Sequence, residues 1–245
     1  MIRSNTFHRA TTFALLFLLA LAIPAAAQTP QGQPIGKEIA QAIQLEIQAV
    51  ALAKQGRHSE AEQLYRQSLA IVEQHAPNDP ILAGSLNNVG HFYVSQRRFA
   101  EATPLLDRAL SIYVAAYGEN HALTATAINN LAGAYIGERK FSEAEPLYQR
   151  SIALTETLLG PDHYAVAISL DQLAQVKFLL GRTTEAEALL ARGLAIAEKA
   201  TGPESPLVVT LLDHMISVLQ AQGRAQEAKA LLDRANRIVS KGAKN

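Results

Sequence analysis

Apolar residues along most of this chain recur at intervals of three and four positions, which is the spacing of an amphipathic α-helix. The segment from Ala122 to Gly160 shows this pattern most clearly. In its first half, Ile128, Leu131 and Tyr135 share one expected helix face, and small Ala132 would let another helix approach closely. Val, Ile and Thr do not alternate at a period of two, and Ala, Leu, Glu and Gln dominate, which argues against a strand. We therefore predict a helix in this half.

The second half of the segment predicts a second helix that begins at Ser142. Its expected buried stripe consists of Leu147, Tyr148, Ile152, Leu154, Leu158 and Leu159. The run Gly160-Pro161-Asp162-His163 then predicts the end of that helix and a turn. The segment as a whole is thus expected to form a pair of antiparallel helices.

Polar residues at the start of the second helix predict how it is capped. Ser142 and Glu145 have the spacing of a capping box, in which a hydroxyl and a carboxylate bond free backbone N–H groups. The same spacing recurs at Ser59 with Glu62 and at Thr184 with Glu187. Pro104 and Pro146 are expected in the first turn, where a missing N–H costs little.

The dipeptide Glu-Ala divides the chain into repeats of nearly constant length. Its glutamates are Glu60, Glu101, Glu143, Glu185 and Glu227, at intervals of 41, 42, 42 and 42 residues. A basic residue precedes each of them by three positions, namely Arg57, Arg98, Lys140, Arg182 and Arg224. Such a period indicates stacked supersecondary units, each of which buries its apolar face against a neighbour.

One repeat is too small to fold by itself. Roughly eight large side chains per repeat would contribute about 1.5–3 kcal/mol each on burial. The backbone entropy of about forty ordered residues costs more than that. We therefore predict one continuous all-α array over residues 37–240, with a flexible lead-in at 28–36 and a short tail at 241–245.

The first 27 residues have the features of a secretory signal peptide. Arg3 and Arg9 give a positive start, residues 11–23 are apolar, and Ala25-Ala26-Ala27 precede an expected cleavage site after Ala27. An uncleaved anchor is the alternative, although the apolar run falls short of the ~20 residues that span a membrane. The expected location is therefore periplasmic or secreted.

Charge and cysteine content narrow the function further. The chain has 22 basic and 22 acidic residues, and removal of residues 1–27 would leave 20 basic against 22 acidic. A nucleic-acid-binding protein would need a clustered excess of Lys and Arg, so nucleic acid is not an expected partner. The chain has no cysteine, which excludes disulfides, thiolate metal sites and an acylated cysteine after the signal.

The repeats resemble the tetratricopeptide repeat family. Ile128, Leu131-Ala132 and Tyr135 match the family's pattern on its first helix, and Ala144, Tyr148 and Ser151 match the pattern on its second. The 42-residue period, the Asn-Asn-Leu-Ala run at 129–132 and the Glu-Ala-Glu-Pro-Leu-Tyr run at 143–148 are similar to the longer, kinesin-light-chain type of repeat. The resemblance covers about residues 39–239 in five units, of which the first and last depart from the pattern.

This resemblance implies a right-handed superhelical solenoid of about five antiparallel helix pairs. It also implies a concave groove, lined by the first helix of each pair, that holds an extended peptide or a partner helix. In family register the groove-facing positions are Glu46, Asn87, Asn129, Asp171 and Asp213 and, one turn on, Val50, His91, Gly133, Gln175 and Ser217. The expected function is an exported protein–protein interaction scaffold, and not an enzyme.

Asparagine side chains carry both a donor and an acceptor, so they can pair with a peptide backbone of any sequence. The predicted partner-binding residues are Asn87, Asn88, His91, Asn129, Asn130, Asp171, Gln175 and Asp213. The alternative for the asparagines is that they hydrogen-bond neighbouring turns and join adjacent repeats. Glu46, Asp171 and Asp213 suggest that the ends of the groove favour a basic or neutral ligand.

The basic residues of the repeats have two interpretations. They are expected mainly to complement the exposed carbonyls at the end of each first helix. The alternative is an edge that binds polyanions.

Signals for catalysis, cofactors and metals are weak. His121 and His163 lie at equivalent positions of adjacent repeats, about 10 Å or more apart, which is too far for one metal ion. No nucleophile arrangement, phosphate-binding loop or paired-carboxylate signature is present, so no cofactor or metal is expected. An enzyme-associated module with chemistry near His91 is the least favoured alternative.

The last predicted helix, residues 226–239, lacks a following helix that could cover it. Its apolar residues are Ala230, Leu231, Leu232, Ala235, Ile238 and Val239. An exposed stripe of this kind would be covered in a homodimer or by a partner. A self-assembling structural unit that uses the open ends of the stack is therefore a further alternative.

Overall fold

A computed structural model of the chain describes residues 36–242, which form ten α-helices and no strand. The helices are α2 (Lys37–Lys54), α3 (His58–His75), α4 (Pro80–Ser95), α5 (Phe99–Tyr117), α6 (Ala122–Gly137), α7 (Phe141–Leu159), α8 (Tyr164–Leu179), α9 (Thr183–Thr201), α10 (Pro206–Ala221) and α11 (Ala225–Gly242). The predicted signal peptide lies outside the described residues. The even-numbered helices are the first of each pair and are called A helices below, and the odd-numbered ones B helices.

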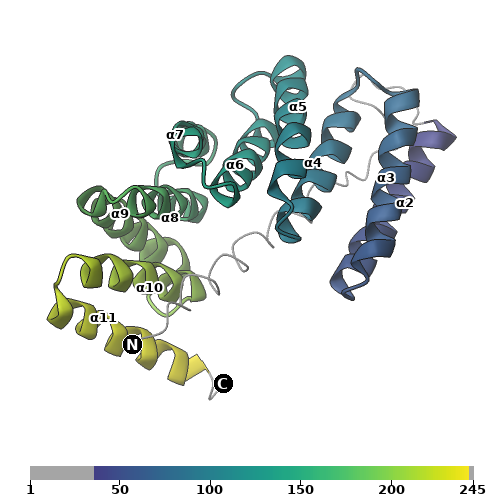
Figure 1. The fold of residues 1–245 in the computed structure, drawn as a ribbon. Coiled ribbons are helices and arrows are strands. Elements are labelled where there is room, and N and C mark those ends of the chain that lie inside the picture. The colour runs from purple at the N-terminus through teal and green to yellow at the C-terminus, as the bar shows by residue number, and fades with distance from the viewer. Residues whose placement is uncertain (1–35, 243–245) are drawn as a thin grey trace. The chain divides into compact units, whose positions relative to one another are not determined.

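The described residues form two compact units, the N-terminal unit of residues 36–139 and the C-terminal unit of residues 140–242. In the N-terminal unit α2 packs on α3, α3 on α4, α4 on α5 and α5 on α6. In the C-terminal unit α7 to α11 follow the same order, each packed on the next (Figure 1). Each unit therefore stacks helices in the order of the sequence, as expected for a repeat protein.

Four of the five described A helices begin at a polar residue that recurs with the period of the chain, and α2 begins after Gly36 instead. The N-cap side chains of Asp79, His121 and His163 accept from the backbone N–H two residues on, and Ser205 accepts from Val208. The distances between these donor and acceptor atoms are 2.8, 3.2, 3.2 and 3.4 Å. His121 and His163 are thus helix caps, and each must present an unprotonated Nδ1 in that role.

Each A helix ends in a turn that needs one residue in the left-handed region. Gly56, Gly181 and Gly223 adopt φ angles of 76–78° there, but Arg97 and Arg139 fill the same place at 61°. In the first repeat the N–H of Arg57 donates to the carbonyl of Leu52, and Arg98, Arg182 and Arg224 repeat this bond. These are Schellman motifs, which use carbonyls that the helix would otherwise leave unpaired.

The predicted capping boxes are wrong. The N-cap residues of α3, α7 and α9 are Arg57, Lys140 and Arg182, and no side-chain cap bond is present there. The helices begin two residues earlier than a Ser142 or Ser59 cap would require, which leaves each serine inside the first turn. Pro104 and Pro146 are accordingly the sixth residues of their helices rather than first-turn residues.

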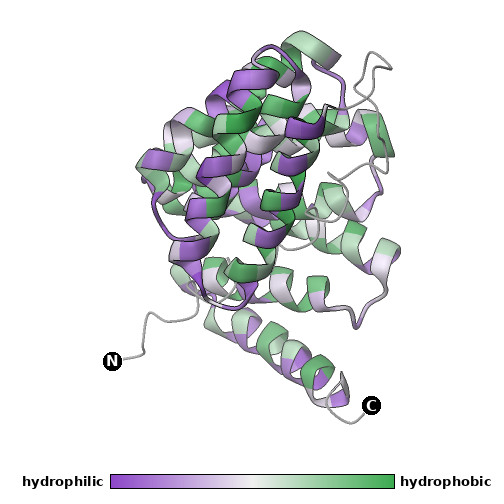
Figure 2. Ribbon diagram, turned by 90° about the vertical axis from the view of Figure 1, so that its right-hand side faces the viewer, coloured by the Kyte–Doolittle hydropathy of each residue, from purple (hydrophilic) through white to green (hydrophobic). Residues whose placement is uncertain are grey.

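Both small and large apolar residues fill the packed faces. Figure 2 shows that hydrophobic and hydrophilic residues are interspersed along the helices. Tyr148, Leu106 and Leu190 are almost fully buried on the B helices, and Ala132 is buried on α6 as predicted. A Cβ placed on Gly90 would lie 2.6 Å from Cγ of Leu106, so α4 and α5 approach closely there. The prediction of a buried stripe is wrong for Leu158 and Leu159, which are exposed at the end of α7.

Candidate functional site: polar rows on the A helices

Polar side chains follow one face of the A helices and bond from one repeat to the next. Each A helix contributes one residue to this row, at the groove-facing position that the sequence predicted. These row residues are Glu46, Asn87, Asn129, Asp171 and Asp213. Within each unit, a row residue of one A helix bonds the residue that follows the row position on the next A helix.

In the N-terminal unit, Glu46 of α2 is held by three donors. Ser68 of α3 and Ser85 of α4 donate to its Oε1 at 3.1 and 2.5 Å, and Asn88 donates to its Oε2 at 2.7 Å. The carboxylate therefore joins the first repeat to the second. Because most of its acceptor capacity is used internally, Glu46 is a poor candidate for binding a cationic ligand.

Asn87 and Asn130 form the second link of this unit. Nδ2 of Asn130 donates to Oδ1 of Asn87 at 2.8 Å, and both side chains are partly exposed. The bond leaves Nδ2 of Asn87 and Oδ1 of Asn130 without a protein partner among the described residues. A donor and an acceptor therefore remain on two adjacent helices, which is the combination that one peptide unit of a ligand can satisfy.

Asn129 and His91 lie near this pair on the same helices but bond neither member. Oδ1 of Asn129 is buried and has no hydrogen-bond partner within the described residues. His91 is partly buried, and burial lowers its pKa, so its imidazole is neutral at neutral pH. Both side chains retain hydrogen-bonding capacity that the described part of the protein leaves unused.

In the C-terminal unit, Asp171 of α8 forms a buried pair with His214 of α10. Nδ1 of His214 lies 2.6 Å from Oδ1 of Asp171, and Nε2 of Gln175 donates to Oδ2 at 3.0 Å. Burial by itself would lower the pKa of His214, but the hydrogen bond and charge of Asp171 outweigh it and raise this pKa. Asp171 is only 5% exposed, so its carboxylate serves the interior rather than a ligand.

Asp213 is the row residue of α10 that keeps contact with solvent. It is partly exposed, and burial raises the pKa of its carboxyl group, an effect that the neighbouring His214 opposes. A cavity of about 10 Å³ lies close by, lined in part by Gln175 and His214. That volume admits about one water molecule, so it is not a small-molecule site.

The structure therefore brings together four of the predicted site residues in two pairs, Asn87 with Asn130 and Asp171 with Gln175. Asn88 bonds Glu46 instead, and no hydrogen bond joins His91, Asn129 or Asp213 to the other predicted residues. Asn87, Asn88, Asn130 and Asp171 all join adjacent repeats, which was the structural alternative for the asparagines. A binding role for all eight stays a prediction.

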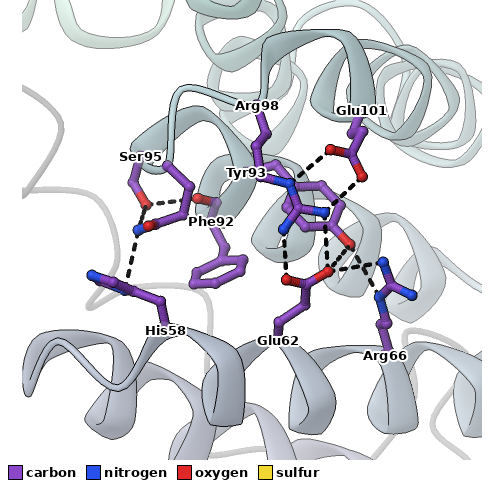
Figure 3. Close-up of polar contacts among 9 residues, drawn as sticks. His58, Glu62, Arg66, Phe92, Tyr93, Ser95, Arg98 and Glu101 are labelled. Atoms are coloured by element: carbon purple, nitrogen blue, oxygen red, sulfur yellow. Dashed lines mark hydrogen bonds and ion pairs between the residues drawn. The ribbon is translucent and has the colours of Figure 1, made fainter.

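A second row, which the sequence interpretation missed, joins the B helices. Arg98 lies 2.5 Å from Glu62 of the preceding repeat and 2.7 Å from Glu101 of its own, and its guanidinium lies 4.3 Å from the centroid of the Tyr93 ring. Figure 3 shows Arg98 between the two carboxylates, with the hydroxyl of Tyr93 close to Glu62 and Arg66. One arginine thus connects two repeats.

This connection, called the inter-repeat staple below, recurs in the C-terminal unit. Arg182 lies 2.9 Å from Glu145, and Arg224 lies 2.6 Å from Glu187. The glutamates are the ones that had been expected in capping boxes, two residues after each Glu-Ala glutamate. Arg98, Arg182 and Arg224 are therefore each paired with carboxylates from two repeats, whereas Arg57 pairs with Glu60 of its own repeat. Pairing of these arginines disfavours a polyanion-binding edge.

Lys177 is an unexpected buried charge in the C-terminal unit. Its side chain is 5% exposed and its Nζ lies 2.6 Å from Glu145 and 2.8 Å from Glu185. It occupies the helix A position where Tyr93 and Tyr135 stand in the preceding repeats. Two carboxylates offset its desolvation, so this repeat replaces a tyrosine contact with an ion cluster.

Profile comparison identifies the family. Tetratricopeptide repeat profiles match residues 81–157 and 123–199, and a further tetratricopeptide repeat profile matches residues 49–80. This chain belongs to the tetratricopeptide repeat family. The matches span all of the middle repeats, in agreement with the resemblance seen in the sequence, and no curated protein sequence matches the chain.

Solved structures of tetratricopeptide-like repeats have the same fold. A putative kinesin light chain of Podosopora anserina with nearly identical TPR-like repeats is 24% identical, with a TM-score of 0.77 over 86% of this chain and 100% of that one. BtubC (BKLC) from P. vanneervenii is 27% identical, with a TM-score of 0.75 over 85% and 83% of the two chains. The predicted all-α solenoid of the kinesin-light-chain type is confirmed by these matches.

A third match is a Rap protein complexed with competence and sporulation factor. It is 17% identical, with a TM-score of 0.66 over 82% of this chain and 54% of that chain. Among residues 36–242, no group of His, Asp or Glu side chains could hold a metal ion. Searched over the same residues, no helix is long and apolar enough to cross a membrane.

Proposed function

We propose that this tetratricopeptide repeat protein is an exported scaffold that binds an extended peptide or protein segment along its A helices. The observation that carries the proposal is the Asn87–Asn130 pair, which leaves one amide donor and one amide acceptor unused on adjacent helices. Membership of a protein-interaction repeat family supports it. So does the likeness to a Rap structure that contains competence and sporulation factor.

The mechanism follows from the geometry of the amides. A peptide unit whose carbonyl faces Nδ2 of Asn87 and whose N–H faces Oδ1 of Asn130 would satisfy both groups. Recognition of this kind reads the backbone, so it depends little on the ligand's sequence. Each such hydrogen bond contributes about 0.5–1.5 kcal/mol net, so apolar contacts must supply the rest of the affinity.

Few residues of the row can influence which ligand charge the protein prefers. Glu46 and Asp171 are engaged by protein donors, so neither favours a basic ligand by itself. Asp213 is the remaining acidic row residue with solvent contact. We expect charge to tune affinity only where a ligand reaches α10, through Asp213.

An experiment on the Asn87–Asn130 pair tests the proposal. Peptides would be selected from a displayed random library against the purified mature protein, and their affinity measured by calorimetry. Asn87→Ala and Asn130→Ala should each weaken binding about five- to tenfold, which is the loss of about one hydrogen bond. Asn120→Ala, an exposed asparagine in the turn before α6, is the matched control and should bind as the unaltered protein does. Selected peptides that bind all three variants equally would contradict the proposal.

Export rests on residues 1–27, whose positive start, apolar run and small residues form the proposed signal peptide. Expression with these residues in a Gram-negative host should yield a soluble protein that begins at Gln28. Intact-mass measurement of the purified protein distinguishes cleavage after Ala27 from the uncleaved anchor. A membrane-bound product that retains Met1 would contradict export as a soluble protein.

A further inference from the structure

The last helix, α11, exposes side chains at positions that every other B helix buries. Leu232 is 43% exposed, and its register equivalents on the other B helices are the buried residues Tyr65, Leu106, Tyr148 and Leu190. Val239 is 59% exposed, and its equivalents Val72, Tyr113, Thr155 and Ala197 are also buried. Position for position, α11 therefore presents the surface that receives a following A helix.

Contacts among residues 36–242 cover only one side of α11. Ala235 and Ile238 are buried against α10, so the helix is anchored to its own repeat. Figure 2 shows hydrophobic and hydrophilic residues interspersed along this helix, next to the C mark. The exposed pair Leu232 and Val239 lies beside the anchored face, and Asn236 and Lys229 continue the uncovered surface at helical spacing.

The charges on this surface differ from those on the inner helices. At the position where Glu62, Glu145 and Glu187 accept an arginine from the next repeat, α11 carries Lys229. Ser240 likewise replaces the glutamates Glu156 and Glu198, which pair with Arg192 and Arg234 of the following B helices. Lys229 is exposed and has no ion pair within residues 36–242. The stacking surface of α11 thus keeps its apolar residues, but a positive charge replaces the negative charge that accepts the arginine in the inner repeats.

This reversal indicates what can occupy the surface. A second copy of the chain stacked head to tail would present Arg57, the N-cap residue of its α3, to Lys229. Like charges repel, so head-to-tail self-assembly does not fit the surface. A pair of copies packed α11 against α11 is the other possible occupant, and the mass of the protein in solution distinguishes it from a partner protein.

We infer that the uncovered face of α11 binds an amphipathic helix of another protein, which carries an acidic residue just beyond its C-terminal end. The helix would pack its apolar stripe on Leu232 and Val239 as an A helix does. Its acidic residue would pair with Lys229 in place of the arginine of an inner staple. This surface lies on a different helix from the Asn87–Asn130 pair, so it is a second binding site.

The chain itself supplies a probe for this site. A peptide of residues 164–182 contains α8 and Arg182, which cover α7 and pair with Glu145 in the intact protein. A second peptide would carry Arg182→Glu and so match the charge of Lys229. Both peptides carry Lys177→Tyr, because Lys177 also contacts Glu145 and would otherwise bring a second cation to Lys229. Affinities of both peptides would be measured by fluorescence anisotropy against the mature protein and against its Lys229→Glu variant.

The inference predicts that the unaltered protein and the Lys229→Glu variant prefer opposite peptides. The unaltered protein should bind the R182E peptide about fivefold more tightly than the peptide that keeps Arg182, since an exposed ion pair replaces a repulsion. Lys229→Glu should invert that ratio. Leu232→Asp should weaken both peptides on either background, and because Leu232 is exposed its fold should be unchanged by circular dichroism. Asn87→Ala should change none of these values, which separates this site from the proposed function.

Three results would overturn the inference. The first is an equal charge preference on both proteins, and the second is binding that Leu232→Asp does not weaken. The third is a dimer of the unaltered protein in sedimentation equilibrium that Leu232→Asp dissolves, because a second copy would then be the occupant.

Discussion

At the scale of single residues, Asp171 and His214 form a buried polar contact whose strength depends on pH. The pKa of His214 is raised in the folded protein because its bond to Asp171 outweighs burial. A raised folded pKa means that the stabilisation is fully present below the ordinary value of about 6.5 and is lost as pH rises through the folded pKa. The pair therefore stabilises the packing of α8 on α10 most in mild acid.

We predict that the free energy of unfolding of the unaltered protein falls as the pH rises above about 6.5, the ordinary pKa of histidine, measured by urea denaturation. His214→Asn should flatten this decline, because the titrating group is gone. A variant whose pH profile parallels that of the unaltered protein would show that His214 is not responsible.

Arg97 and Arg139 adopt the left-handed backbone conformation, and glycine occupies the equivalent position in the other three repeats. Arg97→Gly should raise the unfolding free energy by up to about 1 kcal/mol, because glycine adopts φ near +60° without strain. Gly181→Arg is the matched reverse change and should lower it by a similar amount. Thermal unfolding of both variants measures the effect, and a destabilised Arg97→Gly would contradict the strain argument.

Sequence reasoning succeeded and failed at this scale for definite reasons. It placed Asn87 and Asn129 on one polar row, because their spacing matches the period, and named Asn88 and Asn130 beside them as candidate contacts. It could not decide whether their amides bond one another or a ligand, since that depends on the distance between neighbouring helices. Ser59 and Ser142 were mistaken for caps because the helices begin earlier, at a residue whose N-cap role needs no side-chain bond.

At the scale of helices, Gly90 and Gly84 of α4 offer a matched comparison. A Cβ on Gly90 would lie 2.6 and 2.7 Å from atoms of Leu106, whereas a Cβ on Gly84 would make an ordinary 3.5 Å contact with the Tyr113 hydroxyl. Gly90→Ala should therefore destabilise the protein by about 1–3 kcal/mol through overpacking. Gly84→Ala should stabilise it by up to about 1 kcal/mol through helix propensity.

Chemical denaturation of the two variants measures this pair of predictions. Equal effects would show that α4 and α5 can separate enough to accept the added methyl group. At this scale the sequence predicted most of the structure, because the three-to-four-residue spacing and the period set every helix. The exposure of Leu158 and Leu159 was missed because periodicity marks a face but not how far a neighbour covers it.

At the scale of the whole molecule, ion pairs connect adjacent repeats, and they make the free energy of unfolding depend on pH in the acidic range. Hydrogen bonds from Arg182 and Lys177 lower the pKa of Glu185 to about 2, and Lys177 lowers that of Glu145. A depressed folded pKa gives stability that is present above the ordinary value of about 4.5 and is lost as pH falls toward the folded value. The stack should therefore lose stability between about pH 4.5 and pH 2.

Glu145→Gln should weaken this acid dependence, since it removes a carboxylate shared by Lys177 and Arg182. Asp233→Asn, a carboxyl group outside any ion pair among residues 36–242, is the control and should leave it unchanged. The melting temperature measured from pH 2 to pH 6 provides the comparison. Identical pH profiles for both variants would mean that the staples do not govern the acid response.

The central claim concerns the whole molecule, namely that the A helices read a peptide backbone through Asn87 and Asn130. The most direct test is a double-mutant cycle between Asn130→Ala and a selected peptide in which the contacted amide is replaced by an ester. The ester lacks the N–H group that would donate a hydrogen bond to Oδ1 of Asn130. Each single change should weaken calorimetric affinity about five- to tenfold, and the two together no more than either alone. Losses that simply multiply would show that Asn130 and the peptide backbone do not interact, and would contradict the account.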